Sequence, residues 1–198
     1  MLGRFAGIIG VVCVMGTANA GPLFDAAKQG DAAAVKSLLE TGTPPEDRGL
    51  NDATPLIASA LAGHTEIAKI LLDAGADIME RNRGGFTALH AAAYGGQTDV
   101  VRLLLDRGAD LADRNNEAGQ TPLFMAAEED HLETAELLLA AGADPTAIDR
   151  HGFSVLTQTW SKKRMKMVGL LKQHGAVCQS ANVLGSKDYY QRCLEAGQ

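Results

Sequence analysis

The stretch TALHAAAYGGQTDVVRLLLDRGAD, from Thr87 to Asp110, decides how this chain folds. Apolar residues recur at helical spacing on both sides of Gly95-Gly96, so we predict a short helix that opens at Thr87 and a second that restarts at Gln97. The glycine pair separates the two helices because glycine enters turn conformations at little cost. The stretch therefore predicts two short helices joined by a tight turn.

Nearly the same stretch occurs at residues 54–77 (TPLIASALAGHTEIAKILLDAGAD) and 121–144 (TPLFMAAEEDHLETAELLLAAGAD). The opening threonines are 33 and then 34 residues apart, and a degraded copy begins 33 residues later, at Ser154. A shorter copy precedes them at residues 22–42. Self-similarity with a period of this length is typical of a stacked repeat array.

Each copy has the same physical pattern. A threonine hydroxyl can cap the first helix, a leucine begins its buried face, and alanines allow close packing against the next copy. A glycine then ends the second helix, where left-handed backbone is needed. The connector at residues 111–120 is one residue longer than the others, which explains the 34-residue step. The threonines are Thr54, Thr87 and Thr121, and the terminating glycines are Gly75, Gly108 and Gly142.

The composition favours an all-α fold. Apolar residues make up 46% of the 198 residues, but aromatic residues only 5%, and alanine is plentiful. Small side chains suit close packing of helices, and runs of β-branched residues with alternating polarity are missing, which argues against a sandwich or barrel. A chain of this length can bury a sizeable core.

The repeated elements T-P-L-x-x-A-A, G-H-x-E and L-L-L-x-x-G-A-D, at a period of 33 residues, resemble the ankyrin-repeat family over about residues 22–176. The resemblance implies an L-shaped stack of antiparallel helix pairs with projecting β-hairpin fingers. Partners typically bind on the concave face made by the fingers and first helices. We expect an all-α ankyrin-repeat solenoid of about five stacked helix-turn-helix repeats. Its divisions are residues 21–50 as an N-terminal cap, 54–86, 87–120, 121–153 and 154–176.

The chain also departs from the family pattern. Ile57 and Phe124 replace the usual histidine, which only His90 keeps, and Pro44-Pro45 interrupts the first finger. The last repeat loses most of its motif, and Trp160 stands where the others place a small residue. The helix after it is rich in basic residues, which suggests a docking patch or, as we favour, a solvated capping helix. These residues are Lys162, Lys163, Arg164, Lys166 and Lys172.

The N-terminus has the layout of a secretory signal peptide. Arg4 supplies a positive charge, Phe5 to Gly16 is an uncharged apolar run, and Ala18-Asn19-Ala20 offers small residues for cleavage. The run is shorter than the roughly 20 residues that a membrane anchor requires. We therefore expect residues 1–20 to be removed. Val12 before Cys13 argues against lipid attachment.

Cleavage would leave an acidic protein. Loss of Arg4 reduces the 18 Lys and Arg to 17 against 24 Asp and Glu, a net charge of −7. Nucleic acid and anionic membranes require a basic surface, so we expect neither as a partner. The expected partner is another protein, and the free chain is expected to be a monomer.

Two cysteines remain after cleavage, Cys178 and Cys193. An even number in an exported chain favours a disulfide. Two free buried thiols are the alternative; a zinc site has too few ligands nearby. Residues 188–194 can form a final helix, so we interpret residues 177–198 as a C-terminal cap held to the array by this bond.

The sequence contains no recognisable catalytic or metal site. The five histidines are spread along the repeats, about 10 Å apart, which is too far for shared metal ligation. Nucleophile-elbow, metalloprotease, P-loop and dinucleotide-binding motifs are missing. The cluster Glu128-Glu129-Asp130 lies at a helix end, where a solvated or partner-facing role is the better interpretation. We expect no enzyme activity and no cofactor.

The resemblance implies instead that variable finger and first-helix positions bind a partner. Phe86, Tyr94 and Phe153 carry most weight because exposed aromatic residues beside arginine are typical interface anchors. Phe86 and Phe153 could equally pack between fingers. The full set is Arg81, Arg83, Phe86, Tyr94, Asn115, Glu117, Gln120, Glu128, Glu129, Arg150, His151, Phe153 and Lys162.

The chain is thus expected to be an exported, periplasmic ankyrin-repeat protein that binds another protein through its concave face. Exported bacterial proteins of this kind resemble two groups: immunity proteins that neutralise periplasmic toxins, and oxidative-stress proteins that act beside a catalase. A secreted effector and an unrecognised metal-dependent enzyme are the remaining alternatives.

Overall fold

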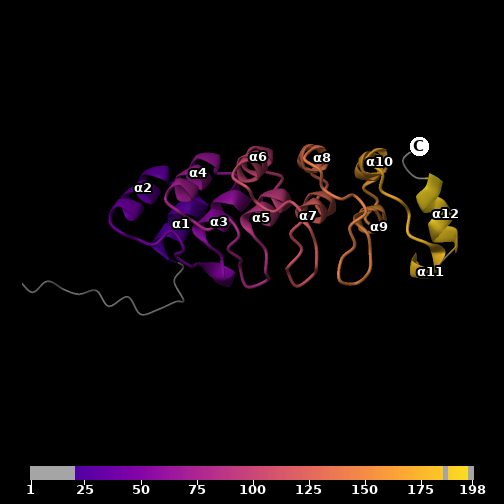
Figure 1. Ribbon diagram of the computed structural model, residues 1–198, viewed down its shortest axis with the longest axis horizontal. Coiled ribbons are helices and arrows are strands. Elements are labelled where there is room, and N and C mark those ends of the chain that lie inside the picture. The colour runs from indigo at the N-terminus through magenta and orange to yellow at the C-terminus, as the bar shows by residue number, and fades with distance from the viewer. Residues whose placement is uncertain (1–20, 185–186, 196–198) are drawn as a thin grey trace, which may run out of the picture.

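The computed structural model describes residues 21–184 and 187–195, so the predicted signal peptide lies outside the described residues. Helix pairs stack side by side in one row (Figure 1), with the first helix of each pair next to the fingers and the second helix on the outside. The first helices are α1 (Pro22–Gln29), α3 (Pro55–Ala62), α5 (Ala88–Tyr94), α7 (Pro122–Glu128) and α9 (Val155–Ser161). The second helices are α2 (Ala32–Glu40), α4 (Thr65–Asp73), α6 (Thr98–Asp106), α8 (Leu132–Ala140) and α10 (Met165–Gln173). The expected all-α solenoid of five helix pairs is confirmed.

The repeats pack through one continuous apolar core. The residue two places after each first-helix N-cap is a leucine with at most 1% of its surface exposed. Four places further on, alanines with no exposed surface let adjacent first helices approach closely. Trp160 takes that position in the last pair, where it is half-buried against the core. The leucines are Leu23, Leu56, Leu89, Leu123 and Leu156, and the alanines are Ala27, Ala60, Ala93 and Ala127.

The fingers differ from the β-hairpins that the family resemblance implies. No strand forms in the described part of the chain, and an isolated β-bridge joins Ile148 to Ser154. A side chain closes each of the last three fingers, and in two of them a backbone bond joins the same two residues, Asn82 to Phe86 and Asp149 to Phe153. The Asn82 Oδ1 accepts hydrogen bonds from the N–H groups of Gly84 and Phe86, both at 3.0 Å. Asn116 and Asp149 accept similar bonds in their own fingers. These Asx turns, with the few backbone bonds beside them, hold the fingers without a regular strand ladder.

Backbone hydrogen bonds join each finger to the next. The N–H of Arg83 donates to Asn51, that of Glu117 to Gly84, and that of Arg150 to Ala118. Each donor is the residue four places before the N-cap of its own repeat, so the bonds follow the repeat register despite the longer connector at 111–120. The fingers consequently form one continuous wall beside the first helices.

The threonine caps are only partly as predicted. The Thr54 hydroxyl accepts a hydrogen bond from the N–H of Ile57, and Thr87 forms a capping box with His90. Thr121 makes no side-chain cap, and its buried Oγ1 has no hydrogen-bond partner. The N–H of Phe124 instead donates to the Thr121 backbone carbonyl at 2.9 Å, which satisfies that N–H without the hydroxyl.

After the last repeat come α11 (Ala181–Leu184) and α12 (Lys187–Glu195), and Cys178 and Cys193 are joined in a disulfide, as predicted. The Lys172 ammonium donates a hydrogen bond of 2.6 Å to the Cys193 carbonyl, near the end of α12. Beside Cys178, the Gln179 side chain accepts from the Ser154 N–H and donates to the Gly152 carbonyl, so the cap also closes the last finger.

No helix in the described ranges is both long and apolar enough to span a membrane.

Candidate functional site

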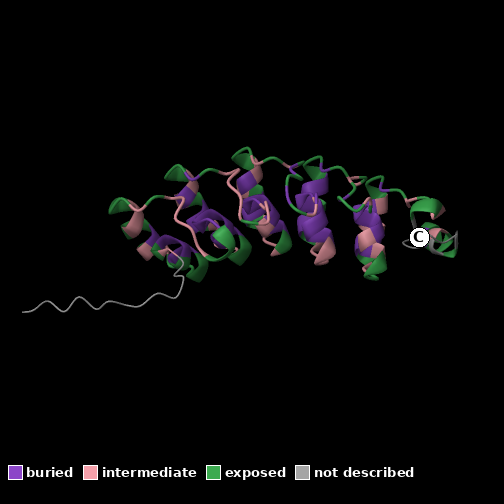
Figure 2. Ribbon diagram, turned by 90° about the horizontal axis from the view of Figure 1, so that it is seen from below, coloured by how far each residue is buried: buried purple, intermediate pink, exposed green. Residues whose placement is uncertain are grey.

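A groove of about 700 Å³ lies between the first helices and the fingers of the first four repeats. Figure 2 views the molecule from the finger side and shows the exposed ends of these helices beside the buried core. Uncharged side chains make up most of the lining; charge is confined to Lys28, Glu128 and Glu129. The lining residues are Phe24, Lys28, Leu50, Asn51, Ala53, Ile57, Ala58, Leu61, Ala62, Asn82, Phe86, His90, Ala91, Tyr94, Gln120, Met125, Glu128 and Glu129.

Repeat register creates the floor of this groove. The position seven residues after each first-helix N-cap lies on the groove side, and it holds Lys28, Leu61, Tyr94 and Glu128 in successive repeats. Leu61 is 46% exposed and Tyr94 48% exposed. Two large apolar side chains therefore lie one repeat apart in the middle of the row, and about half of the surface of each is exposed.

The fingers provide the facing apolar residues. Leu50 belongs to a single 3-10 turn (Leu50–Asp52) and is 70% exposed, the highest value for a large apolar side chain among the residues that the structure describes. Phe86 is half-buried, and its ring meets the His90 ring edge-on at a centroid distance of 5.6 Å. Phe86 thus packs against the core and lines the groove at once, so the two interpretations of this residue are compatible.

Beneath the groove floor, His90 joins the helix α5 to the next finger. Its Nδ1 lies 2.9 Å from the Thr87 hydroxyl, and its Nε2 lies 3.1 Å and 3.0 Å from the carbonyl oxygens of Asp113 and Gln120. Two carbonyl acceptors at Nε2 fix the proton there, so Nδ1 accepts from the hydroxyl. Burial lowers the pKa of His90 below its ordinary value, although the Gln120 carbonyl and the Asp113 charge oppose the change. His90 is therefore a neutral structural residue.

Arg81 is held by the neighbouring finger. Its guanidinium donates to both carboxylate oxygens of Asp113, at 2.7 Å and 3.2 Å, and also to the Gly85 carbonyl. Burial alone would raise the pKa of Asp113, but the Arg81 guanidinium and the Asn115 N–H outweigh it and hold that pKa below its ordinary range. Arg48 makes the equivalent ion pair with Glu80 one repeat earlier. The structure gives Arg81 a role in stacking the fingers.

The C-terminal end of the groove is acidic. Glu128 forms an ion pair with Lys162 of the next repeat, so these two predicted residues lie together. Asp130 pairs more loosely with Arg164, at 3.8 Å. Glu129 has no ion-pair partner among the residues that the structure describes, so it carries the uncompensated negative charge at this end.

The groove gathers five of the residues that the sequence singled out: Phe86, Tyr94, Gln120, Glu128 and Glu129. The others lie outside its lining, on the fingers or, for Lys162, at the C-terminal end of α9. Phe153, on the last finger, is 37% exposed. These others are Arg81, Arg83, Asn115, Glu117, Arg150, His151, Phe153 and Lys162. Their part in binding stays a prediction.

Sequence reasoning missed Leu50 and Leu61, which are more prominent in the groove than Phe86. Leu61 could have been found because it shares its repeat position with Tyr94, which was selected. In a helix as apolar as PLIASALA, however, an apolar residue at the seventh position is easily taken for one more core residue. Leu50 lies four places before its N-cap, the repeat position of the selected Arg83, Glu117 and Arg150, but those residues are charged and Leu50 is apolar, so it was not selected with them.

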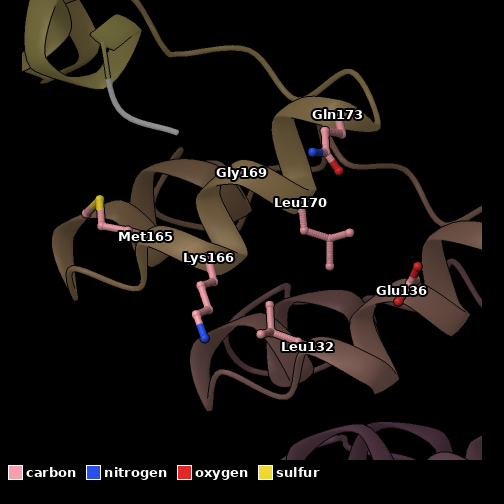
Figure 3. Close-up of a pocket in the computed structure, with 7 residues that line it drawn as sticks. All are labelled: Leu132, Glu136, Met165, Lys166, Gly169, Leu170 and Gln173. Carbon is pink, nitrogen blue, oxygen red and sulfur yellow. The ribbon is translucent and has the colours of Figure 1, made fainter. Parts of the chain in front are cut away.

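A second hollow, of about 420 Å³, lies on the outside of the stack between α8 and α10. Figure 3 shows the Leu132 and Leu170 side chains facing the space between these helices. Gly169 opens the hollow because it occupies the repeat position where earlier repeats carry Lys69, Arg102 and Glu136. Among the described residues, no group of three or more His, Cys, Asp or Glu side chains could hold a metal ion.

Comparison with known proteins agrees with the helix stack. The chain matches the family described as Ankyrin repeats (3 copies) over residues 23–115 and 85–149. The match stops before α9, although α9 and α10 continue the stack with the same pairing. No curated protein matches the chain. With more than half of its length matched by this family pattern, the chain belongs to the ankyrin repeat family.

Proposed function

We propose that this chain is an exported protein that binds a partner protein in the apolar groove between its first helices and fingers. Ankyrin repeats point to a role in protein–protein interaction. The observation that carries the proposal is the uncovered pair Leu61 and Tyr94, because exposed apolar side chains gathered in a groove are typical of interaction surfaces. Aromatic residues at the centre of such a surface supply much of the binding energy.

The disulfide supports export. Disulfides persist in oxidising compartments and are rare in the cytosol, and Cys178–Cys193 holds a cap whose helices contact α10 sparsely. Together with the predicted signal peptide, this favours the periplasm, with secretion as the alternative. Within the periplasm, we propose that the protein is an immunity protein whose groove sequesters a segment of a toxin. A stress-defence role beside a catalase would use the same surface.

The test places a photo-crosslinking amino acid at Leu61, in full-length protein expressed with its native N-terminus. Arg102, exposed on the outer helix α6, is the matched control position. We expect one discrete crosslinked partner from Leu61 and none from Arg102, with both adducts formed in the periplasmic fraction. Equal crosslinking from the two positions would contradict binding in the groove.

The identity of the crosslinked protein separates the two roles. A toxin whose growth inhibition is suppressed by co-expression of this protein, and no longer suppressed by the Leu61→Ser variant, supports the immunity proposal. A crosslinked peroxide-degrading enzyme, together with peroxide sensitivity of a deletion strain, would replace it with the stress-defence role.

A further inference from the structure

Within the groove that we propose as the binding site, the spacing of the apolar floor determines which backbone conformation a partner can use. Leu61 and Tyr94 occupy the same position in successive repeats, and adjacent packed helices lie about 10 Å apart. A single partner segment that contacts both residues must therefore present apolar side chains about 10 Å apart on one face.

A helix meets this requirement. Seven residues of α-helix advance about 10.5 Å, and residues i and i+7 lie on nearly the same face. An extended strand advances about 10 Å in three residues, but residues i and i+3 then point to opposite sides. Spacings of two or four residues keep one face but advance about 6.6 Å or 13 Å, which misses the repeat.

The ends of the groove add a charge requirement. Glu129, next to the residue that takes the Tyr94 position in the following repeat, lines the groove without an ion-pair partner among the described residues. Glu128 beside it is already paired with Lys162. At the other end, Lys28 lies one helical turn from Asp25, which has the opposite charge, although no ion pair joins these two residues. The whole chain carries a net charge of −6, which further favours a basic partner.

We propose that the groove binds an amphipathic helix that carries two large apolar residues seven positions apart and a basic residue seven positions further along. The apolar pair rests on Leu61 and Tyr94, and the basic residue meets Glu129. Leu50 and Phe86 cover the same helix from the finger side. This inference rests on the proposed function, because it defines the partner of the same groove.

The test uses designed helical peptides of about 22 residues, which span two or three repeats. Each has an alanine and glutamine background, two leucines seven residues apart, and lysine, glutamine or glutamate at the third position. A fourth peptide keeps the lysine but moves the second leucine from i+7 to i+5, which turns it off the face. Circular dichroism establishes that all four are equally helical, and fluorescence anisotropy measures their binding to the full chain.

We expect the lysine peptide to bind tightest, followed by the glutamine and then the glutamate peptide. The Glu129→Lys variant should reverse this order, because the positive charge that it introduces repels the lysine of the peptide and attracts the glutamate. The peptide with i+5 spacing, and the Leu61→Ser variant with any peptide, should bind about tenfold more weakly. Met165→Ser, in the outer hollow of α8 and α10, should bind every peptide like the unmodified protein.

Three results would overturn the inference: no saturable binding, equal binding of the i+5 peptide, or a peptide order that Glu129→Lys leaves unchanged. A proline-broken, extended version that binds as well as the helix would also overturn it. If Leu61 crosslinks to a partner in cells but any of these results is obtained, the partner is not a helix of this kind, and the proposed function of the groove still holds. Equal crosslinking at Leu61 and Arg102 would contradict the proposed function itself.

Discussion

The Nε2 atom of His131 lies 2.9 Å from the carbonyl oxygen of Tyr94. The same tie occurs in the two preceding repeats, where His64 approaches the Lys28 carbonyl at 3.2 Å and Gln97 that of Leu61 at 3.4 Å. Each of these three repeats thus satisfies an end carbonyl of the previous first helix, at the residue which that helix presents to the groove. Stability of the stack and position of the groove floor are therefore coupled.

Gly96 tests this coupling. It has φ +68°, and an added Cβ would lie 2.5 Å from the His131 ring, whereas Gly108 has φ +87° and open space around it. Gly108→Ala should lose about 1 kcal/mol of unfolding free energy, from backbone strain alone. Gly96→Ala should lose about 2–3 kcal/mol, because His131 must also leave the Tyr94 carbonyl. Urea denaturation measures both, and equal losses would show that the histidine tie contributes nothing.

The two similar threonines are expected to respond differently to the same substitution. The Thr87 hydroxyl bonds the buried His90 Nδ1, whereas the Thr121 hydroxyl has no partner. Thr87→Val should therefore lower the unfolding free energy by about 1–2 kcal/mol, and Thr121→Val should change it by less than about 0.5 kcal/mol. Valine keeps the shape of threonine, so the comparison isolates the hydroxyl. A comparable loss in both variants would mean that the hydrogen bond to His90 does not account for the contribution of Thr87 to the unfolding free energy.

The helices could be predicted from sequence because their signals are local and repeated: a capping residue, an apolar stripe and a glycine at the same offset in each copy. At the offset of Gly96, however, the last two repeats carry Asp130 and Lys163, which also adopt positive φ, at 66° and 60°. Helix packing over the whole repeat imposes that conformation, so residue preference alone does not identify the turn.

The groove was harder to predict for a different reason. Leu61 follows the same helical period as the core, and only its place at the open edge of the stack leaves it exposed. Arg81 was selected as a binding residue because the sequence does not show its ion pair with Asp113, which lies 32 positions away in the next finger. Neither distinction can be made from residue type, since both depend on contacts between repeats.

The buried His90 should make stability depend on pH. Its pKa is lowered in the folded protein, from an ordinary value of 6.5. Between the lowered value and 6.5 the unfolded chain binds more protons, so the unfolding free energy should fall as pH drops below about 6.5 and level off above it. Denaturation at a series of pH values measures this slope. His90→Gln should abolish it, whereas removal of the exposed His151 should not; a slope that persists without His90 would assign the effect to another group.

Two neighbouring arginines on one finger are expected to differ in their effect on stability, because Arg81 joins two fingers and Arg83 faces solvent. Arg81 holds the nearly buried Asp113, whereas Arg83 is exposed and its side chain makes no hydrogen bond to another described residue. Arg81→Ala should lower the unfolding free energy by about 1–3 kcal/mol, since it leaves a buried carboxylate unpaired. Arg83→Ala should leave stability within about 0.5 kcal/mol. If thermal and urea denaturation cannot distinguish the two variants, the Arg81–Asp113 pair does not stabilise the fingers.

The C-terminal cap should depend on its disulfide, while the groove should not. Cys178 and Cys193 close a segment of 15 residues, for which the entropy of the unfolded chain predicts about 3 kcal/mol of stabilisation. Reductant, or the double substitution Cys178→Ser and Cys193→Ser, should lower the melting temperature and increase amide hydrogen exchange in α12. The double variant should not respond further to reductant, which controls for other effects of the reagent. Because the cap contacts the last repeat and the groove spans the first four, helix binding should persist in the reduced protein. An unchanged melting temperature would mean that Lys172 and Gln179 hold the cap without the covalent bond.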